Sequence, residues 1–318
     1  MKKIRLSIIG AGNISKYHLK VITTFKDVEV TSIFSRTQKK SKDLAHEFKI
    51  KNIYKSIKEM IKNENPNGIY ILVSADQIYK VIKEILIYKI PFFVEKPPGI
   101  SFNQFKKLSE LSENFKIKNM VGFNRRFYSI FAKGLKILKK KGKIKYVSIY
   151  ANERTWLYKN DKFFFDNIIM LNSIHTLDLI DFLVGKLDSY TIQKENNKLK
   201  KSINLKVNFI SKNSTLGTYY INNMSPYFWS IKLFGKGVTV VFDNFEEGYW
   251  IDKNFKKNQI KPNVKDLNFK AGFYDQFKAF KMLITKGKLE WPAVNLYKCY
   301  NTMKIASKIS KEYKKVNL

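Results

Sequence analysis

The chain has 318 residues, of which 44% are hydrophobic and 15% aromatic. This length and composition allow two domains with well-buried cores and exclude a disordered chain. The single cysteine, Cys299, excludes an intramolecular disulfide and a cysteine zinc cage, so we expect a reducing, cytoplasmic compartment and no metal site. The apolar runs are short compared with the roughly 20 residues of a membrane-spanning helix, so no membrane partner is expected.

The net charge of +34 raises the question of nucleic acid binding. However, the 55 lysines are spread along the whole chain, and abundant Ile, Asn, Phe and Tyr are typical of an AT-rich coding sequence. Only five arginines are present, whereas proteins that read nucleic acids use arginine for bidentate contacts. We therefore expect no nucleic acid partner and keep a basic nucleic-acid binder as an alternative hypothesis. The positive field would also attract anionic small molecules.

The first 120 residues alternate short apolar runs with helical patterns. Strands are expected at 4–9, 28–34, 69–73, 92–94 and 119–122, and helices at about 14–24, 37–48, 55–63, 76–89 and 102–115. Such alternation predicts a parallel sheet with helices on both faces. The strands are nearly continuous apolar runs, as is typical of strands covered on both sides. The expected fold class is α/β, with a doubly wound parallel sheet in an amino-terminal domain of residues 1–122.

After residue 123 the pattern changes to that of an α+β domain, expected over 123–318. A helix at 125–140, a strand at 144–151 and a helix at about 168–184 are followed by β runs between 187 and 253, which include 203–210, 215–221, 228–234 and 238–242. These runs predict a large open, mostly antiparallel sheet. Helices at 272–286 and about 294–314 close the chain, and we expect the last one to return toward the first domain.

A glycine-rich turn follows the first strand directly. Gly10 is expected to make the tight turn and Gly12 to let the backbone approach a pyrophosphate, whose charge the helix N-terminus would stabilise. Ser15 replaces the third glycine of the dinucleotide fingerprint, a change expected to loosen the packing of helix on strand. Because the turn lies in a β-α-β setting, it predicts a dinucleotide site, with an ordinary tight turn as the alternative.

The end of the second strand bears on the choice of dinucleotide. An NAD-specific site would place Asp or Glu there to bind the ribose 2′-hydroxyl, but Ser35, Arg36 and Thr37 follow Phe34. A hydroxyl beside an arginine suits a 2′-phosphate. NADP(H) is therefore favoured and NAD(H) is the alternative. A third explanation is that Arg36 simply faces solvent at the end of the strand and binds neither cofactor.

Three further motifs follow in a specific order. Glu95-Lys96-Pro97 ends the strand at 92–94, Gly122-Phe123-Asn124-Arg125-Arg126-Phe127 opens the second domain, and His175-x-x-Asp178 lies on a predicted helix. Together with the glycine turn, the whole chain resembles the Gfo/Idh/MocA family (glucose–fructose oxidoreductase and inositol dehydrogenase). The resemblance implies a Rossmann domain, and hydride transfer between NAD(P) and a hydroxyl or keto carbon of a sugar or nucleotide sugar. It also implies assembly as a homodimer or homotetramer.

The resemblance assigns roles to individual residues. Lys96 and His175 would be catalytic, the lysine beside the nicotinamide and the histidine as acid/base, while Asp178 would orient structure. Arg125, Asn172 and His175 would bind substrate, and helical spacing places 172, 175 and 178 on one face independently. Arg154, which follows the strand at 144–151, is added to this expected set because it is one of the few arginines and not because of the resemblance. His18 and His46 are read as structural. The expected cofactor-binding set is Gly10, Ala11, Gly12, Asn13, Ile14, Ser35, Arg36, Thr37, Val73, Ser74, Glu95, Lys96 and Asn124.

Two departures from the family pattern bear on activity. Many members carry a glycine-rich stretch where this chain has Phe165-Asp166-Asn167, and an Asp four residues before the histidine where it has Leu171. Leucine can neither accept a proton nor hydrogen-bond a sugar hydroxyl. The alternative hypothesis is therefore a catalytically inactive dinucleotide-binding sensor or subunit of the same fold.

The few arginines in this lysine-rich chain are informative. Four of them, Arg36, Arg125, Arg126 and Arg154, fall in segments expected to line the cleft, the last close to Trp156 and Tyr158. Planar, bidentate binding of phosphate or carboxylate is a property of arginine rather than lysine. Unless this placement is chance, the substrate is expected to carry an acid or a phosphate.

Overall fold

The structure is a computed structural model that describes residues 3–155, 161–195, 203–223, 226 and 229–317, with only the backbone for 315–317. The chain divides into two compact units, each described separately below. Unit 1 comprises Met1–Asn124 and Lys265–Tyr300, and unit 2 comprises Arg125–Val264 and Asn301–Leu318.

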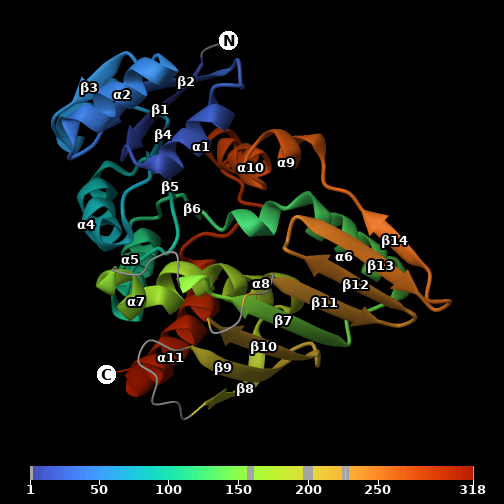
Figure 1. Cartoon of the computed structure of the whole chain (residues 1–318). Coiled ribbons are helices and arrows are strands. Elements are labelled where there is room, and N and C mark those ends of the chain that lie inside the picture. Colours follow the sequence, from blue (N-terminus) through green and yellow to red (C-terminus); the bar gives the residue numbers. More distant parts are fainter. Residues whose placement is uncertain (1–2, 156–160, 196–202, 224–225, 227–228, 318) are drawn as a thin grey trace. The chain divides into compact units, whose positions relative to one another are not determined.

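Unit 1 contains a six-stranded parallel sheet in the order β3-β2-β1-β4-β5-β6 (Figure 1). Its strands are β1 (Ile4–Ile9), β2 (Val28–Phe34), β3 (Asn52–Tyr54), β4 (Gly68–Ile71), β5 (Phe92–Val94) and β6 (Asn119–Val121). Its helices are α1 (Asn13–Ile22), α2 (Gln38–Phe48), α3 (Ile57–Glu64), α4 (Ala75–Ile85), η1 (Leu86–Tyr88), α5 (Phe102–Asn114), α9 (Val264–Asn268), α10 (Phe273–Lys286) and η5 (Tyr297–Cys299). The predicted doubly wound α/β fold is confirmed.

The strand order explains where unit 1 can bind a ligand. The chain winds outward from β1 to β3, then returns to β4 on the other side of β1. In such sheets the crevice at the carboxyl ends of the two central strands binds nucleotides. Strands β4 and β5 are buried at every residue, as the nearly continuous apolar runs predicted.

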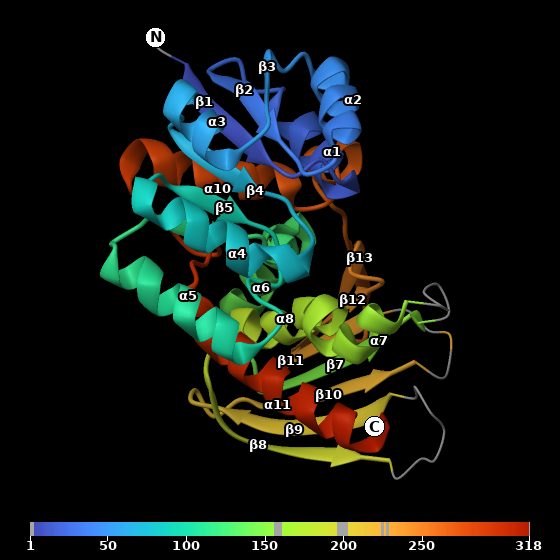
Figure 2. The ribbon, with the colours of Figure 1, turned by 90° about the vertical axis from the view of Figure 1, so that its left-hand side faces the viewer.

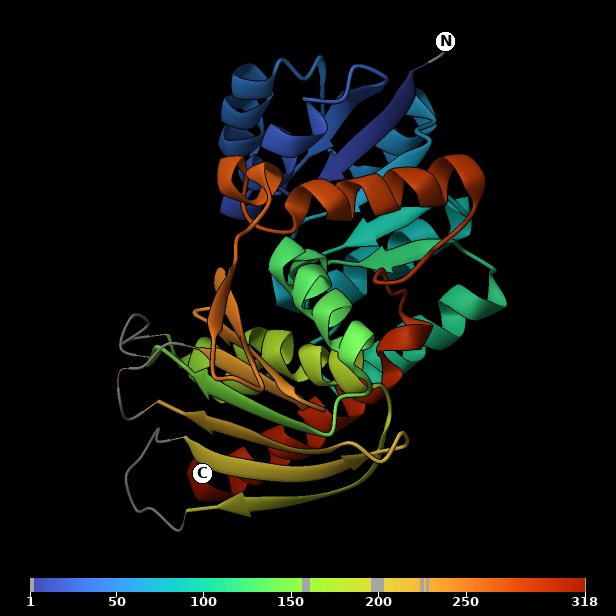
Figure 3. The ribbon, with the colours of Figure 1, turned by 90° about the vertical axis from the view of Figure 1, so that its right-hand side faces the viewer.

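Helix α10 belongs to unit 1, which differs from the expected division at residue 122. It packs beside α1, on the side of the sheet opposite α3 and α4 (Figures 2 and 3). Aromatic contacts hold it there: Phe277 meets Phe25 at 4.7 Å and Phe280 meets Tyr70 at 5.0 Å between ring centroids. The residues of the last helix from Asn301 onward belong to unit 2, where the expected division placed them, and the expected return of this helix toward the first domain stays a prediction. A periodic apolar pattern in the sequence predicts that one face of a helix is buried, but it does not show against which sheet that face packs.

Unit 2 contains an eight-stranded sheet in the order β14-β13-β12-β11-β7-β10-β9-β8, antiparallel except for the β7–β10 pair. The strands are β7 (Tyr146–Asn152), β8 (Leu187–Lys194), β9 (Asn204–Ser211), β10 (Leu216–Asn222), β11 (Ser230–Gly235), β12 (Val238–Asp243), β13 (Glu247–Asp252) and β14 (Lys257–Ile260). The helical segments are η2 (Asn124–Phe127), α6 (Ser129–Lys141), α7 (Lys162–Ile168), η4 (Ile169–Ser173), α8 (Ile174–Val184) and α11 (Tyr300–Asn317). The predicted open, mostly antiparallel sheet is confirmed.

The segment α7-η4-α8 is one helical run with a π-helical turn, Ile169–Ser173, in its middle. By length and composition Lys162–Val184 could cross a membrane, but 72% of its most apolar window is buried inside the protein. Its apolar character is therefore that of a core helix, which packs with α11 against the sheet (Figure 2). A π turn inserts one extra residue per turn and is found frequently at functional sites.

Candidate active site

The glycine turn of unit 1 has the geometry that a dinucleotide site requires. Gly10 has φ +115°, and a Cβ atom there would lie 2.3 Å from the Leu72 carbonyl oxygen, so no other residue fits. Gly12 precedes α1 as its N-cap, and a Cβ atom there would meet nothing within 4 Å. The turn thus leaves open space in front of the helix N-terminus, where backbone amides bind phosphate.

Ser15 does not loosen the turn as expected. Its side chain is fully buried, and its hydroxyl donates a hydrogen bond to the Gly10 carbonyl oxygen at 3.0 Å. The serine therefore ties the first turn of α1 to the end of β1. This hydrogen bond compensates for the missing third glycine.

A pocket of about 200 Å³ opens in front of this turn. It brings together the predicted Gly10, Ala11, Gly12, Ser35, Arg36, Thr37, Val73 and Ser74, and it adds Lys40 and Gln77, which the sequence analysis did not single out. Asn13 and Ile14 begin α1 and are not among the lining residues. The lining offers backbone amides, hydroxyls and two cations, which fits a dinucleotide phosphate.

The Arg36 side chain is exposed at the end of β2, and its charge also acts on Asp76 in the first turn of α4. Burial alone would raise the Asp76 pKa, but hydrogen bonds from Ser74 and Gln77, together with the Arg36 charge, lower it. The carboxylate does not line the pocket, whereas Arg36 and Lys40 do. The wall next to Ser35 is therefore basic.

Glu95 fixes the loop that carries Lys96. The buried Glu95 carboxylate lies 2.8 Å from His18 Nε2 and accepts a hydrogen bond from the Lys96 backbone amide at 3.2 Å. The next peptide bond, Lys96–Pro97, is cis, and the Lys96 side chain is half-buried. His18, read as structural, is the partner that satisfies Glu95.

The remaining unit 1 candidate, Asn124, has a structural contact. Its side-chain amide donates a hydrogen bond to the Ala271 carbonyl oxygen at 3.1 Å. The bond joins the end of the first segment of unit 1 to the segment 265–300. The role of Asn124 toward nicotinamide stays a prediction.

In unit 2, Asp178 pairs with Arg126 in the protein interior. The Arg126 Nε and Nη2 atoms each donate to a different Asp178 oxygen at 2.7 Å, and Nη2 also reaches Asp181 at 3.1 Å. Burial raises the Asp178 pKa, and the Arg126 charge opposes that rise. A carboxylate fully occupied in this way orients structure, as expected from the sequence, and Arg126 is its buried partner.

Glu153 is a residue that the sequence analysis missed. It follows β7, is 1% exposed, and accepts a hydrogen bond from Ser173 Oγ at 2.7 Å and one from the Asn172 side-chain amide. Both donors belong to the π turn. The sequence alone does not single out Glu153, because 19 residues separate it from Asn172 and only the fold brings the two side chains together.

His175 lies in the first turn of α8, directly after this π turn, and is half-buried. Because Glu153 holds Asn172 and Ser173, it also sets the orientation of the helix segment that carries the histidine. Leu171 lies in the same turn and is half-buried. The leucine side chain carries no oxygen, whereas the Glu153 carboxylate contacts the two residues that follow it, Asn172 and Ser173.

Arg125 and Arg154 both lie against Trp229. The guanidinium carbon is 4.2 Å from the centroid of the Trp229 ring for Arg125 and 5.3 Å for Arg154. Burial lowers the pKa of Arg125, whereas the Tyr128 and Glu153 side chains raise it. The two arginines predicted to bind substrate are thus brought to one indole, while Trp156 and Tyr158 lie outside the described residues.

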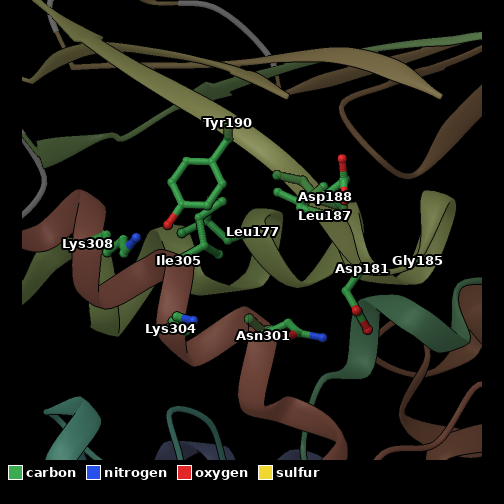
Figure 4. A pocket seen from close by; sticks show the side chains of 12 residues that line it. Leu177, Asp181, Gly185, Leu187, Asp188, Tyr190, Asn301, Lys304, Ile305 and Lys308 are labelled. Carbon is green, nitrogen blue, oxygen red and sulfur yellow. The ribbon is translucent and has the colours of Figure 1, made fainter. Parts of the chain in front are cut away.

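A second cavity in unit 2, of about 250 Å³, lies between α8, β8 and α11 (Figure 4). Its α8 residues, Leu177, Ile180 and Asp181, are on the helix face opposite His175 by helical periodicity. Lysine and aspartate side chains both line it, and no predicted site residue does. It is separate from the candidate site.

Known proteins support the same assignment. Residues 4–123 match the GFO_IDH_MocA model, described as an oxidoreductase family with an NAD-binding Rossmann fold. The rhizopine catabolism protein MocA of Rhizobium meliloti is 24% identical over 127 residues, which are 40% of this chain and 39% of that protein. The match thus spans about two fifths of this curated relative.

Solved structures extend the likeness over the whole fold. UDP-N-acetylglucosamine 3-dehydrogenase GnnA from Acidithiobacillus ferrooxidans superposes with a TM-score of 0.83 at 13% identity, covering 100% of both chains. An oxidoreductase from Agrobacterium radiobacter in complex with NAD+, L-tartaric acid and magnesium superposes with a TM-score of 0.82 at 14% identity, covering 99% of this chain and 96% of that one.

The fold and the glycine turn therefore define a protein with an NAD-binding Rossmann fold, whose second unit has the fold found in these two solved structures. Within that class, residues 4–123 match the model of the Gfo/Idh/MocA oxidoreductase family, which confirms the resemblance seen in the sequence motifs.

Proposed function

We propose that the protein is an NAD(P)-dependent oxidoreductase that transfers a hydride between nicotinamide and a hydroxyl or keto carbon of a sugar or nucleotide sugar. The observation that carries the proposal is the open glycine turn of unit 1 together with a lysine whose loop is held by the buried Glu95. GnnA, which shares the fold, acts on a nucleotide sugar. The bound dinucleotide would accept or supply the hydride.

Each proposed catalytic residue has a distinct task. In the oxidation direction, the Lys96 ammonium donates a hydrogen bond to the substrate oxygen and stabilises its developing negative charge. His175 takes the hydroxyl proton, and it returns a proton in the reduction direction. General acid–base groups of this kind contribute about 10²–10⁴-fold each.

NADP(H) is the proposed preference. Ser35, Arg36 and Lys40 supply a hydroxyl and two cations to the pocket, and no carboxylate among its lining residues competes for a 2′-phosphate. Arginine grips phosphate with a planar fork. NAD(H) remains the second candidate, because the fold is shared with a protein bound to NAD+.

Leu171 motivates a second candidate function, a dinucleotide-binding subunit without catalysis. Reaction with a panel of keto sugars and NADPH, followed at 340 nm, separates the two. Turnover that Lys96→Met and His175→Asn each abolish supports the enzyme, whereas NADPH binding without turnover on any sugar supports the inactive subunit. We also propose that the protein acts in the cytoplasm as a homodimer or homotetramer.

A further inference from the structure

Trp229 is a fixed platform within unit 2. Its indole Nε1 donates a hydrogen bond to the Asn152 carbonyl oxygen at 2.6 Å, and its ring stacks on Phe245 with centroids 5.8 Å apart and planes 24° apart. Arg125 lies over both rings, at 4.2 Å from Trp229 and 5.0 Å from Phe245. These contacts hold the indole beside the guanidinium groups.

The buried charge of Arg125 lies near the Glu153 carboxylate but forms no ion pair with it among the described residues. The residue is 7% exposed, its Nη1 atom has no hydrogen-bond partner, and no carboxylate in the described part of the chain forms an ion pair with it. Glu153 acts on Arg125 electrostatically, yet its oxygens accept hydrogen bonds from Asn172 and Ser173. Buried charges in proteins are normally paired and hydrogen-bonded.

Cation–π contact alone does not explain this arrangement. The contact of an arginine with an indole contributes less than the desolvation of an unpaired buried ion costs. Arg154, whose guanidinium lies against the same ring, adds a second positive charge close by. Two like charges beside one indole are stabilised by an anion that accepts hydrogen bonds from both.

We propose that Arg125, Arg154 and Trp229 form an anion subsite that binds a carboxylate or phosphate group of the substrate. The Nη1 atom of Arg125 donates to one oxygen of the anion, and Arg154 donates to another. The indole shields these hydrogen bonds from water. Assigning the anion to a sugar substrate rests on the proposed function, while the subsite itself lies entirely in unit 2.

The test is isothermal titration of the full-length protein with three probes of similar size: D-glucuronate, D-glucose 1-phosphate and uncharged D-glucose. We expect at least one anionic sugar to bind and D-glucose to bind at least about tenfold more weakly. The tighter of the two anionic probes identifies carboxylate or phosphate as the preferred group. Equal affinity for D-glucose, or no binding of either anion, overturns the subsite.

Matched variants locate the binding. Arg125→Met and Arg154→Met are each expected to weaken the binding of the anionic probe by about tenfold or more, because each removes a charged hydrogen-bond donor. Lys253→Met removes the same charge from an exposed turn and is expected to leave the affinity within twofold. Retention of affinity in both arginine variants overturns the subsite. Because Arg154 is half-buried, its variant decides the question if Arg125→Met does not fold.

NADPH titration of the same samples separates the two proposals. Loss of anion binding in the arginine variants with NADPH binding intact supports the subsite. Absence of NADPH binding in the native chain, with anion binding intact, contradicts the proposed function and leaves the subsite standing.

Discussion

His18 Nε2 and Glu95 Oε1 lie 2.8 Å apart in the core of unit 1, where aromatic rings surround the imidazole. This pair joins the first helix of the Rossmann domain to the loop that presents Lys96. Because Glu95 also accepts from the Lys96 amide, the histidine holds the lysine loop through one intermediate carboxylate.

We predict that His18→Leu destabilises the protein by about 1–3 kcal/mol, because it leaves a buried carboxylate without its partner. It should also lower turnover more than it weakens NADPH binding, since the glycine turn does not depend on His18. Urea unfolding and NADPH titration measure the two effects. His46→Leu, on α2, is the control, and an equal loss of stability in both variants would contradict the role of His18.

The two glycines of the turn should behave differently. Gly10→Ala places a Cβ atom 2.3 Å from a carbonyl oxygen at a positive φ, so we expect a loss of about 2–4 kcal/mol in unfolding free energy. Gly12→Ala meets open space and should fold with nearly native stability but bind NADPH at least about tenfold more weakly. Thermal unfolding followed by NADPH titration distinguishes them, and native affinity in Gly12→Ala would contradict the site.

Arg36 should determine cofactor preference. Arg36→Met is expected to weaken the affinity for NADPH by about tenfold or more and to leave the affinity for NADH within twofold, because only NADPH carries the 2′-phosphate. Lys39→Met removes a neighbouring exposed charge that does not line the pocket and serves as the control. Equal weakening of both cofactors by Arg36→Met would show that Arg36 does not read this phosphate.

Glu153 should support the helix that carries His175. Glu153→Ala leaves Ser173 and Asn172 without their hydrogen-bond acceptor. We therefore expect the free energy of unfolding to fall by about 1–3 kcal/mol and turnover to decrease. Glu246→Ala removes an exposed carboxylate and should change neither. Full activity in Glu153→Ala would show that the π turn orients His175 without this carboxylate.

Glu64 gives the protein a defined acid sensitivity. Burial alone would raise its pKa, but hydrogen bonds from Tyr54, Asn52 and Arg5 lower it below its ordinary value of 4.5. A lowered pKa in the folded state means that the stabilisation is present above pH 4.5 and is lost as the pH falls through the folded value. Glu64→Gln should therefore lower stability at neutral pH and flatten the change in unfolding free energy between about pH 5 and 3.

The sequence predicted the elements that repeat a strong pattern. Strands such as β1 and β4 are apolar runs bounded by turns, and the glycine turn identifies itself by its place after β1. The three-residue strand β3 and the π turn at 169–173 were not predicted, because neither leaves a hydrophobic period to detect. Glu153 and Trp229 became visible only when the sheet brought β7 and β11 beside the helices.

The assignment of α10 to unit 1 shows a related limit. Its aromatic residues Phe277 and Phe280 predict a buried face, yet the partners that choose the unit, Phe25 and Tyr70, lie more than 200 residues earlier. The buried pairing of Arg126 with Asp178 and Asp181 was not predicted either, because it depends on how helix α8, which carries both acids, packs in the fold.

The most direct test of the central claim is isothermal titration of the native protein with NADPH, repeated with Gly12→Ala. The open glycine turn predicts saturable binding of one NADPH per chain in the native protein and at least about tenfold weaker binding in the variant. Absence of binding in the native chain, or equal affinity in the two proteins, would contradict the dinucleotide site and with it the proposed hydride transfer.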